Sequence, residues 1–169
     1  MSSRTIIAPL ASTALVLTLV GCSPSVRDTS VTMGGSPGEI CLPVPPGGVF
    51  VYGEFLTLEP GASPMKVVQV ELNDSHGVEL VRSSALNPEV GTGIMSMSLD
   101  DPVELWEERK PLGEVVLGEE PVNVLVELRR TGSDRGTVGS VRVNLSGPNG
   151  ESYAEGSTTI VLSDPCHAA

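Results

Sequence analysis

Apolar and polar residues alternate with a period of two along much of the chain after position 40. In segment 122–129, for example, Val122, Val124, Val126 and Leu128 occupy every second position. Such alternation, with many valines and threonines, is typical of strands that bury one face. Strands are therefore predicted at 50–58, 66–72, 78–82, 94–99, 112–117, 122–129, 141–146 and 158–162.

Turn-forming residues separate these runs. Pro148-Asn149-Gly150 predicts a hairpin turn, because this composition favours tight reversals between strands. Ser133–Gly136 predicts a second turn, which would make the strands on its two sides antiparallel neighbours. Gly53 lies inside the first predicted strand and predicts a bulge there.

The middle of the chain allows two interpretations. Asp101-Pro102-Val103-Glu104 combines an N-cap residue, a proline at the first helical position and an early glutamate, which predicts a short helix over 102–109. The alternative is a loop that tucks Trp106 into the edge of the sheets.

About seven or eight strands with no long helix predict one all-β domain. Two antiparallel sheets packed face to face would bury the alternating apolar faces, so we expect an immunoglobulin-like β-sandwich. The spacing of cysteine, tryptophan and cysteine found in antibody domains is absent from the sequence, so the expectation concerns the architecture alone.

The N-terminal segment has the parts of a secretory signal. Arg4 precedes an apolar run from Ile6 to Val20, which is too short for a good membrane-spanning helix. The run ends in Leu19-Val20-Gly21-Cys22, which resembles the lipobox of bacterial lipoproteins. That resemblance implies cleavage of residues 1–21 and attachment of diacylglycerol and palmitate to Cys22. It places the protein on the extracytoplasmic face of a cell membrane, held there by its lipid anchor.

Residues 22–40 are rich in serine, glycine, threonine and proline and have no periodic apolar pattern. They are predicted to form a flexible tether that spans roughly 20–25 Å as a random coil. Residues 41–169 would then form the single β-sandwich domain.

The formal net charge is −11. Nucleic-acid binding is not expected, because its usual footprint is a basic patch. The charge would also be repelled by an anionic lipid surface, so membrane attachment must come from the lipid.

Two cysteines remain if Cys22 carries the lipid. Cys41 and Cys166 lie near the two ends of the predicted domain, and an exported compartment permits oxidation, so a disulfide between them is predicted. The alternative is two free thiols that act as ligands or nucleophiles.

No motif in the sequence indicates an enzyme or a bound cofactor. The only histidines are His76 and His167, and no serine lies in a G-x-S-x-G elbow. A soft-metal site of an envelope copper carrier is the alternative to a simple binding role, with Met95, Met97 and His76 as candidate Cu(I) ligands. Gap filling in a core poor in aromatic residues explains the same methionines without a metal.

The segment Leu125–Leu145 contains a Leu-Arg-Arg-Thr-Gly turn and a Val-Arg-Val strand, followed later by Cys166. It resembles the C-terminal half of small uncharacterised secreted proteins of actinobacteria, which implies a β-sandwich and an exported location. Together these features predict a non-catalytic binding or structural module at the cell envelope, with an envelope protein as its partner. The segments 73–77, 133–136 and 100–110 are candidate surface loops for such a role.

Overall fold

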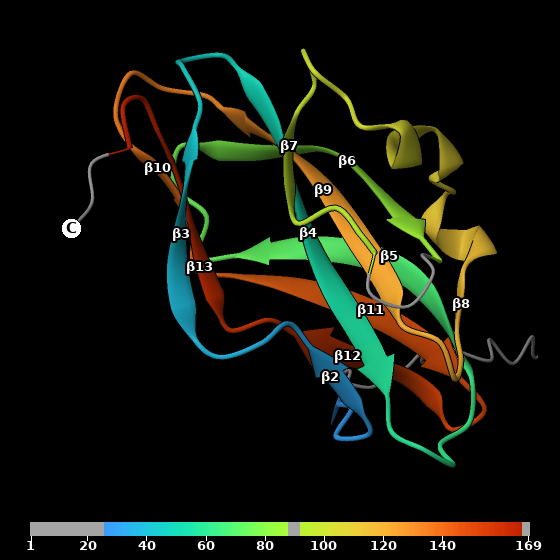
Figure 1. Ribbon diagram of the computed structural model, residues 1–169. Coiled ribbons are helices and arrows are strands. Elements are labelled where there is room, and N and C mark those ends of the chain that lie inside the picture. Colours follow the sequence, from blue (N-terminus) through green and yellow to red (C-terminus); the bar gives the residue numbers. More distant parts are fainter. Residues whose placement is uncertain (1–25, 88–91, 167–169) are drawn as a thin grey trace, which may run out of the picture.

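The computed structural model describes residues 26–87 and 92–166, which form β-strands joined by turns and two short 3₁₀ helices (Figure 1). The elements are β1 (Val26–Arg27), β2 (Val31–Met33), β3 (Gly38–Pro43), β4 (Val49–Leu58), β5 (Met65–Asn73), β6 (Val78–Leu86), β7 (Ser96–Ser98), η1 (Glu104–Glu108), η2 (Leu112–Glu114), β8 (Val116–Leu117), β9 (Val122–Arg130), β10 (Gly136–Val138), β11 (Ser140–Gly147), β12 (Gly150–Glu155) and β13 (Thr158–Ser163).

The strands form three sheets. The first has the order β1-β12-β11-β5-β8, the second has the order β2-β4-β9-β6 with β7 also paired to β4, and the third is β10-β13-β3. In Figure 1 the third sheet stands at one side, where β10, β13 and β3 lie next to the ends of the two larger sheets.

One hydrophobic core joins the three sheets. Its buried side chains come from alternate positions, such as Val143 of β11, Val124 of β9 and Ile160 of β13. The same alternation was visible in the sequence, and the predicted all-β sandwich is confirmed.

The predicted number of strands was too low. The described residues contain thirteen strands, and the five that were not predicted are β1, β2, β3, β10 and β12. β1, β2 and β10 are only two or three residues long, and so few residues cannot show a repeating pattern. β3 and β12 have six residues each but lack a clear alternation of buried apolar positions. Nor are all pairings antiparallel, since β1 runs parallel to β12 and β3 runs parallel to β13.

The predicted pairing across Ser133–Gly136 is wrong. β9 pairs with β4 and β6, whereas β11 pairs with β5 and β12 in the opposite sheet. Between them the short strand β10 pairs with β13, so the chain crosses from one large sheet to the other. The predicted hairpin at 148–150 does form, and it joins β11 to β12.

The predicted tether is also wrong over most of its length. Among the described residues, β1 already lies at Val26–Arg27, and β2 pairs with the end of β4, where Val31 and Met33 are buried. Three alternating residues within a run of serine and glycine gave too weak a signal to predict a strand. The sandwich domain therefore begins at or before Val26 and not at Cys41.

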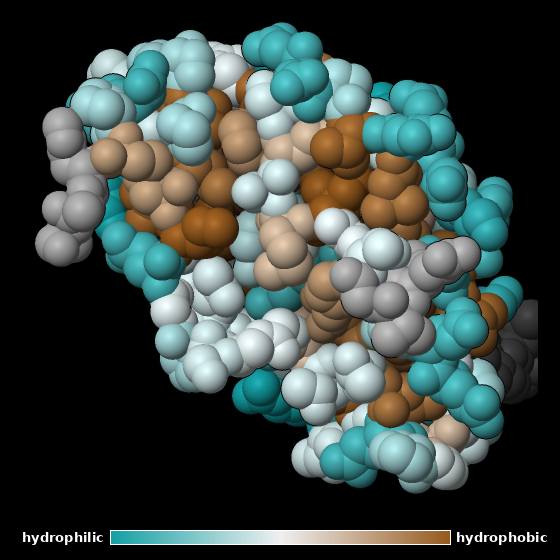
Figure 2. All heavy atoms as spheres, viewed as in Figure 1, coloured by the Kyte–Doolittle hydropathy of each residue, from teal (hydrophilic) through white to brown (hydrophobic). Residues whose placement is uncertain are grey.

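Residues 92–110 form a segment, here called the strap, that covers the outer face of β4 and β9. Ile94, Met97 and Trp106 of the strap pack on this face against Val51 and Leu125. Figure 2 shows that hydrophobic atoms remain visible between β7 and η1, surrounded by hydrophilic ones. The strap thus covers the outer face of β4 and β9 and forms a second, smaller hydrophobic cluster with it.

The strap explains two features of the sequence. Gly53 does not form a bulge, since its register with Leu125 is regular. A side chain there would instead clash with the carbonyl oxygen of Ile94, and the Gly53 amide donates a hydrogen bond to the Met95 carbonyl at 2.9 Å. The predicted helix over 102–109 is a shorter 3₁₀ turn with Trp106 buried, which agrees better with the loop alternative.

Strand boundaries differ elsewhere for similar reasons. The strand predicted over 112–117 is the 3₁₀ helix η2 followed by the two residues of β8, and β6 extends four residues beyond its predicted end at Arg82. Ser83 and Ser84 of β6 gave no apolar alternation, although they pair with β9.

Candidate functional site

One end of the sandwich is hollowed. A cavity of about 560 Å³ lies among β1, the β1–β2 turn, the β4–β5 loop and the β11–β12 hairpin. A second cavity of about 410 Å³ adjoins it, and Gly61 and Ala62 line both. We call the two together the end groove. It is built from four chain segments that the sheets bring to one end of the molecule.

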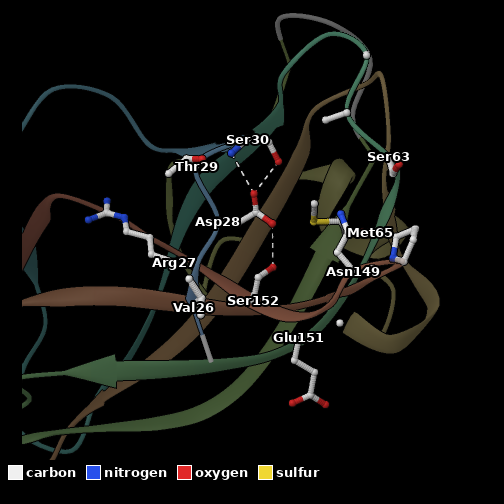
Figure 3. A pocket seen from close by; sticks show the side chains of 15 residues that line it. Val26, Arg27, Asp28, Thr29, Ser30, Ser63, Met65, Asn149, Glu151 and Ser152 are labelled. Carbon is white, nitrogen blue, oxygen red and sulfur yellow. Dashed lines mark hydrogen bonds between the residues drawn. The ribbon is translucent and has the colours of Figure 1, made fainter. Parts of the chain in front are cut away.

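Asp28 of the end groove accepts hydrogen bonds from two neighbouring serines (Figure 3). Its Oδ1 accepts hydrogen bonds from the Ser30 amide at 2.9 Å and the Ser30 hydroxyl at 2.6 Å, and its Oδ2 accepts one from the Ser152 hydroxyl at 2.9 Å. These bonds hold the pKa of Asp28 below its ordinary value, with the Ser30 hydroxyl as the largest cause. The carboxylate is therefore charged and fixed at neutral pH.

Local sequence accounts for the position of Asp28. An aspartate followed two residues later by serine readily forms a side-chain-to-backbone bond that turns the chain. The Asp28 amide also donates to the Tyr153 carbonyl at 2.8 Å, which continues the parallel pairing of β1 with β12. The turn thereby directs the carboxylate toward the β11–β12 hairpin.

The end groove is more acidic than basic. Asp28 and Glu151 line one cavity with Arg27, and Glu59 and Glu119 line the other. In Figure 3 the Glu151 side chain extends away from Asp28 and Ser152. Carboxylates spread along a hollow, facing few cations, create a local potential that attracts positively charged groups.

A second unusual group is Glu54, on the inner face of β4. Its residue is only 3% exposed, and its Oε1 has no hydrogen-bond partner. Burial raises the pKa of Glu54 to about 7, and hydrogen bonds from Tyr52 and Thr158 offset only part of that effect. Burial likewise raises the pKa of Tyr52 to about 12.

Two glycines make room for the Glu54 carboxyl group. A Cβ atom added to Gly34 or to Gly156 would clash with its oxygens. Gly34 also has a φ of +70°, a conformation that favours glycine. The carboxyl group thus fills a small space between the β2–β3 and β12–β13 turns, where it is enclosed by protein and not open to a substrate.

The predicted disulfide is present. The Cys41 and Cys166 sulfurs are 2.00 Å apart, with their Cα atoms at 5.8 Å. Cys41 belongs to β3, and Cys166 follows β13, the parallel partner of β3. Cys22, the predicted lipid attachment site, lies outside the described residues, as does His167.

The candidate copper ligands do not share one site. Met97 is 5% exposed within the core of the strap, and its sulfur accepts a hydrogen bond from the Val103 amide at 3.4 Å. Met95, by contrast, is 53% exposed and does not belong to that core. His76 lies in the β5–β6 turn, where its backbone pairs with Thr137. Met97 fills space in the core of the strap, which explains this methionine without a metal.

Residues 26–87 and 92–166 contain neither a metal-binding cluster nor a membrane-spanning helix. Among them, no group of three or more histidine, cysteine, aspartate or glutamate side chains is arranged to hold a metal ion. Over the same ranges, no helix is long and apolar enough to cross a membrane.

Sequence reasoning missed both the end groove and Glu54. The groove depends on loops far apart in the chain, and no local pattern indicates that they meet. Glu54 did leave a signal, because it shares the inward face of its strand with Tyr52 and Leu56. A glutamate at an inward position of an alternating run is a candidate buried acid.

Comparison with known proteins identifies no family. No protein-family model and no curated protein matches the chain. Among solved structures, the Vibrio cholerae VesB protease is similar over 80% of this chain and 32% of its own, with 12% identity and a TM-score of 0.42. The PapD-like domain 7 of human CEP192 is similar over 95% of this chain and 100% of its own, with 10% identity and a TM-score of 0.39. The chain spans about a third of the protease, and likenesses this weak establish neither a common activity nor a common partner.

Proposed function

We propose that the protein is a lipid-anchored, non-catalytic binding module on the extracytoplasmic face of a cell membrane. Its binding site is the end groove, and its partner is an envelope protein that offers a positively charged segment. The observation that carries the proposal is the position of β1, which lines the groove and begins four residues after Cys22.

The short distance to the anchor supports this arrangement. A chain advances at most about 3.6 Å per residue, so Val26 lies within about 14 Å of a lipidated Cys22. The flexible tether expected over residues 22–40 is thereby shortened to the few residues before Val26. A lipidated protein would therefore hold the end groove close to the headgroups, facing proteins that lie at the membrane surface.

The chemistry of Asp28 supports binding over catalysis. A general acid or base works best with a pKa near the working pH. Asp28 has a lowered pKa and already accepts three hydrogen bonds, so it exchanges protons poorly near neutral pH. A fixed carboxylate of this kind is suited to pair with lysine or arginine of a partner.

The anchor is tested by labelling cells with palmitate. The wild-type protein is expected to take up the label and to fractionate with membranes, and the variant Cys22→Ser is expected to do neither. Membrane association of Cys22→Ser equal to that of the wild type would refute the anchor.

The groove is tested by crosslinking in intact cells with a photoreactive residue at Ser63, which lines the groove and is exposed. The matched control carries the same residue at Glu107, an exposed position on the strap. A partner should crosslink from position 63 and not from 107, and Asp28→Asn should reduce the yield. Equal yields from both positions, or a yield unchanged by Asp28→Asn, would show that the groove does not bind the partner.

A further inference from the structure

A separate cavity of about 410 Å³ lies where the end of the strap meets β6. Its lining residues are Arg82, Ser83, Ser84, Arg109, Lys110 and Pro111. Three of these six residues are cations and none is an acid, although the whole chain has 21 acidic against 10 basic residues. The lining of this cavity is therefore positively charged, whereas the protein as a whole is negatively charged.

The fold fixes the side chain of Arg109 and the main chain of Lys110. The Arg109 guanidinium lies over the Trp106 ring, 4.1 Å from its centre, and donates a hydrogen bond to the Trp106 carbonyl at 2.7 Å. Lys110 is fixed through its backbone, which exchanges two hydrogen bonds with Ala85 of β6 at 2.8 and 3.0 Å. An anion entering this cavity would meet cations whose main chain is already ordered, which lowers the entropy cost of binding.

Much of the positive charge at this cavity is not neutralised by the protein. Arg82 has one long ion pair, in which its Nε is 3.8 Å from Glu127 Oε1. The Lys110 ammonium has no ion pair with any residue in the part of the chain that the structure describes. Ser83 and Ser84 also line the cavity. Because consecutive strand residues point to opposite faces, one of these two hydroxyl groups can add a hydrogen-bond donor for a bound anion.

We propose that this cavity is a binding site for a phosphoryl group. Guanidinium groups match the tetrahedral oxygens of phosphate through paired hydrogen bonds, and an ammonium group adds a point charge. Three cations, of which only Arg82 is paired with a glutamate, balance a dianion better than a singly charged carboxylate. The phosphoryl group comes either from a soluble phosphate compound or from a phospholipid headgroup, and both sources present the same oxygens to these side chains.

Trp106 provides a direct measurement, because it is the single tryptophan of the chain and Arg109 stacks on it. The purified wild-type protein is titrated with inorganic phosphate at constant ionic strength, since salt alone screens exposed charges. A saturable change in tryptophan fluorescence is expected. Lys110→Gln and Arg82→Gln should each weaken binding about tenfold or more, because each removes a charged hydrogen-bond donor.

The matched control is Arg135→Gln. Arg135 is an exposed arginine that pairs with Glu39 at 3.3 Å and does not line the cavity, so its loss should leave phosphate binding unchanged. Thermal denaturation of each variant establishes that it is folded, which is expected because the bonds that fix Lys110 are made by its main chain.

The same titration with vesicles distinguishes the two sources. Saturation by inorganic phosphate assigns the site to a soluble phosphate compound. Saturation by phosphatidylglycerol vesicles alone, with none by phosphatidylcholine vesicles, assigns it to an anionic headgroup. A change that does not saturate with either ligand, or that is the same in Lys110→Gln and Arg82→Gln as in the wild type, overturns the proposal.

Discussion

The buried carboxyl group of Glu54 should make the protein more stable in mild acid than in mild base. Burial raises its pKa from 4.5 to about 7 in the folded state, so the folded protein binds this proton more tightly than the unfolded chain does. The stability that the protonated Glu54 contributes is therefore greatest below pH 4.5, the pKa of this group in the unfolded chain. It is lost as the pH rises through about 7, the pKa in the folded protein.

The size of the effect follows from the two pKa values. Each unit of difference corresponds to about 1.4 kcal/mol, so the full penalty for ionising Glu54 is about 3 kcal/mol. Between pH 5 and pH 8 most of that penalty develops, and the free energy of unfolding should fall by about 2 to 3 kcal/mol. Such a loss is a large part of the stability of a small domain.

Urea denaturation of the wild type and of Glu54→Gln at pH 5 and pH 8 measures this effect. Glutamine keeps the shape of the side chain and removes the charge, so Glu54→Gln should lose about 2 to 3 kcal/mol less than the wild type over the same interval. The comparison cancels the general repulsion among the acidic residues, which acts on both proteins.

Glu155→Gln is the control, because hydrogen bonds, chiefly from Ser140, lower the pKa of Glu155. The ionised Glu155 side chain contributes to stability above the ordinary pKa of a glutamate, and that contribution is lost only in stronger acid. Glu155→Gln should therefore show the same change of unfolding free energy between pH 5 and pH 8 as the wild type. Equal pH dependence of Glu54→Gln and the wild type would refute the assignment of the effect to Glu54.

Three further predictions concern stability. Gly156→Ala should destabilise the protein by about 2 kcal/mol or more in thermal denaturation, because the new Cβ would clash with Glu54, and adding Glu54→Ala should recover part of the loss; no recovery would exclude this contact as the cause. Reduction of the disulfide, or the double change Cys41→Ala with Cys166→Ala, should cost roughly 4–5 kcal/mol in urea denaturation, because the bond spans 125 residues, and an unchanged midpoint would contradict this. Arg130→Met should cost about 3 kcal/mol by the same assay, because the buried guanidinium donates to three carbonyl groups that would lose a partner; a loss below about 0.5 kcal/mol would indicate that water replaces it.

The sequence indicated the long strands well because their side chains alternate between a buried and an exposed face. Val141, Val143 and Leu145 of β11 are an example, since all three are buried and the residues between them are not. The disulfide could be predicted for a different reason, namely that only two cysteines remained after Cys22. In both cases the residue types alone carried the signal.

Pairing partners could not be predicted, because alternation shows that a strand has a buried face and not which strand lies beside it. β9 illustrates a second limit. Asn123 and Glu127 look like solvent-facing positions, yet both are buried. The strap covers Asn123, whose side chain accepts a hydrogen bond from the Ile94 amide at 2.7 Å. Only the tertiary structure shows that this face is covered.

The double burial of β9 has a consequence for hydrogen exchange. β9 lies between β4 and β6, with the main core on one face and the strap on the other, and every residue from Val122 to Leu128 is buried. Its amide protons should exchange with solvent only when the whole domain unfolds, whereas β1, a two-residue edge strand, should exchange through local opening. The most protected amides would thus lie in the centre of the second sheet, and amides with little protection would border the end groove.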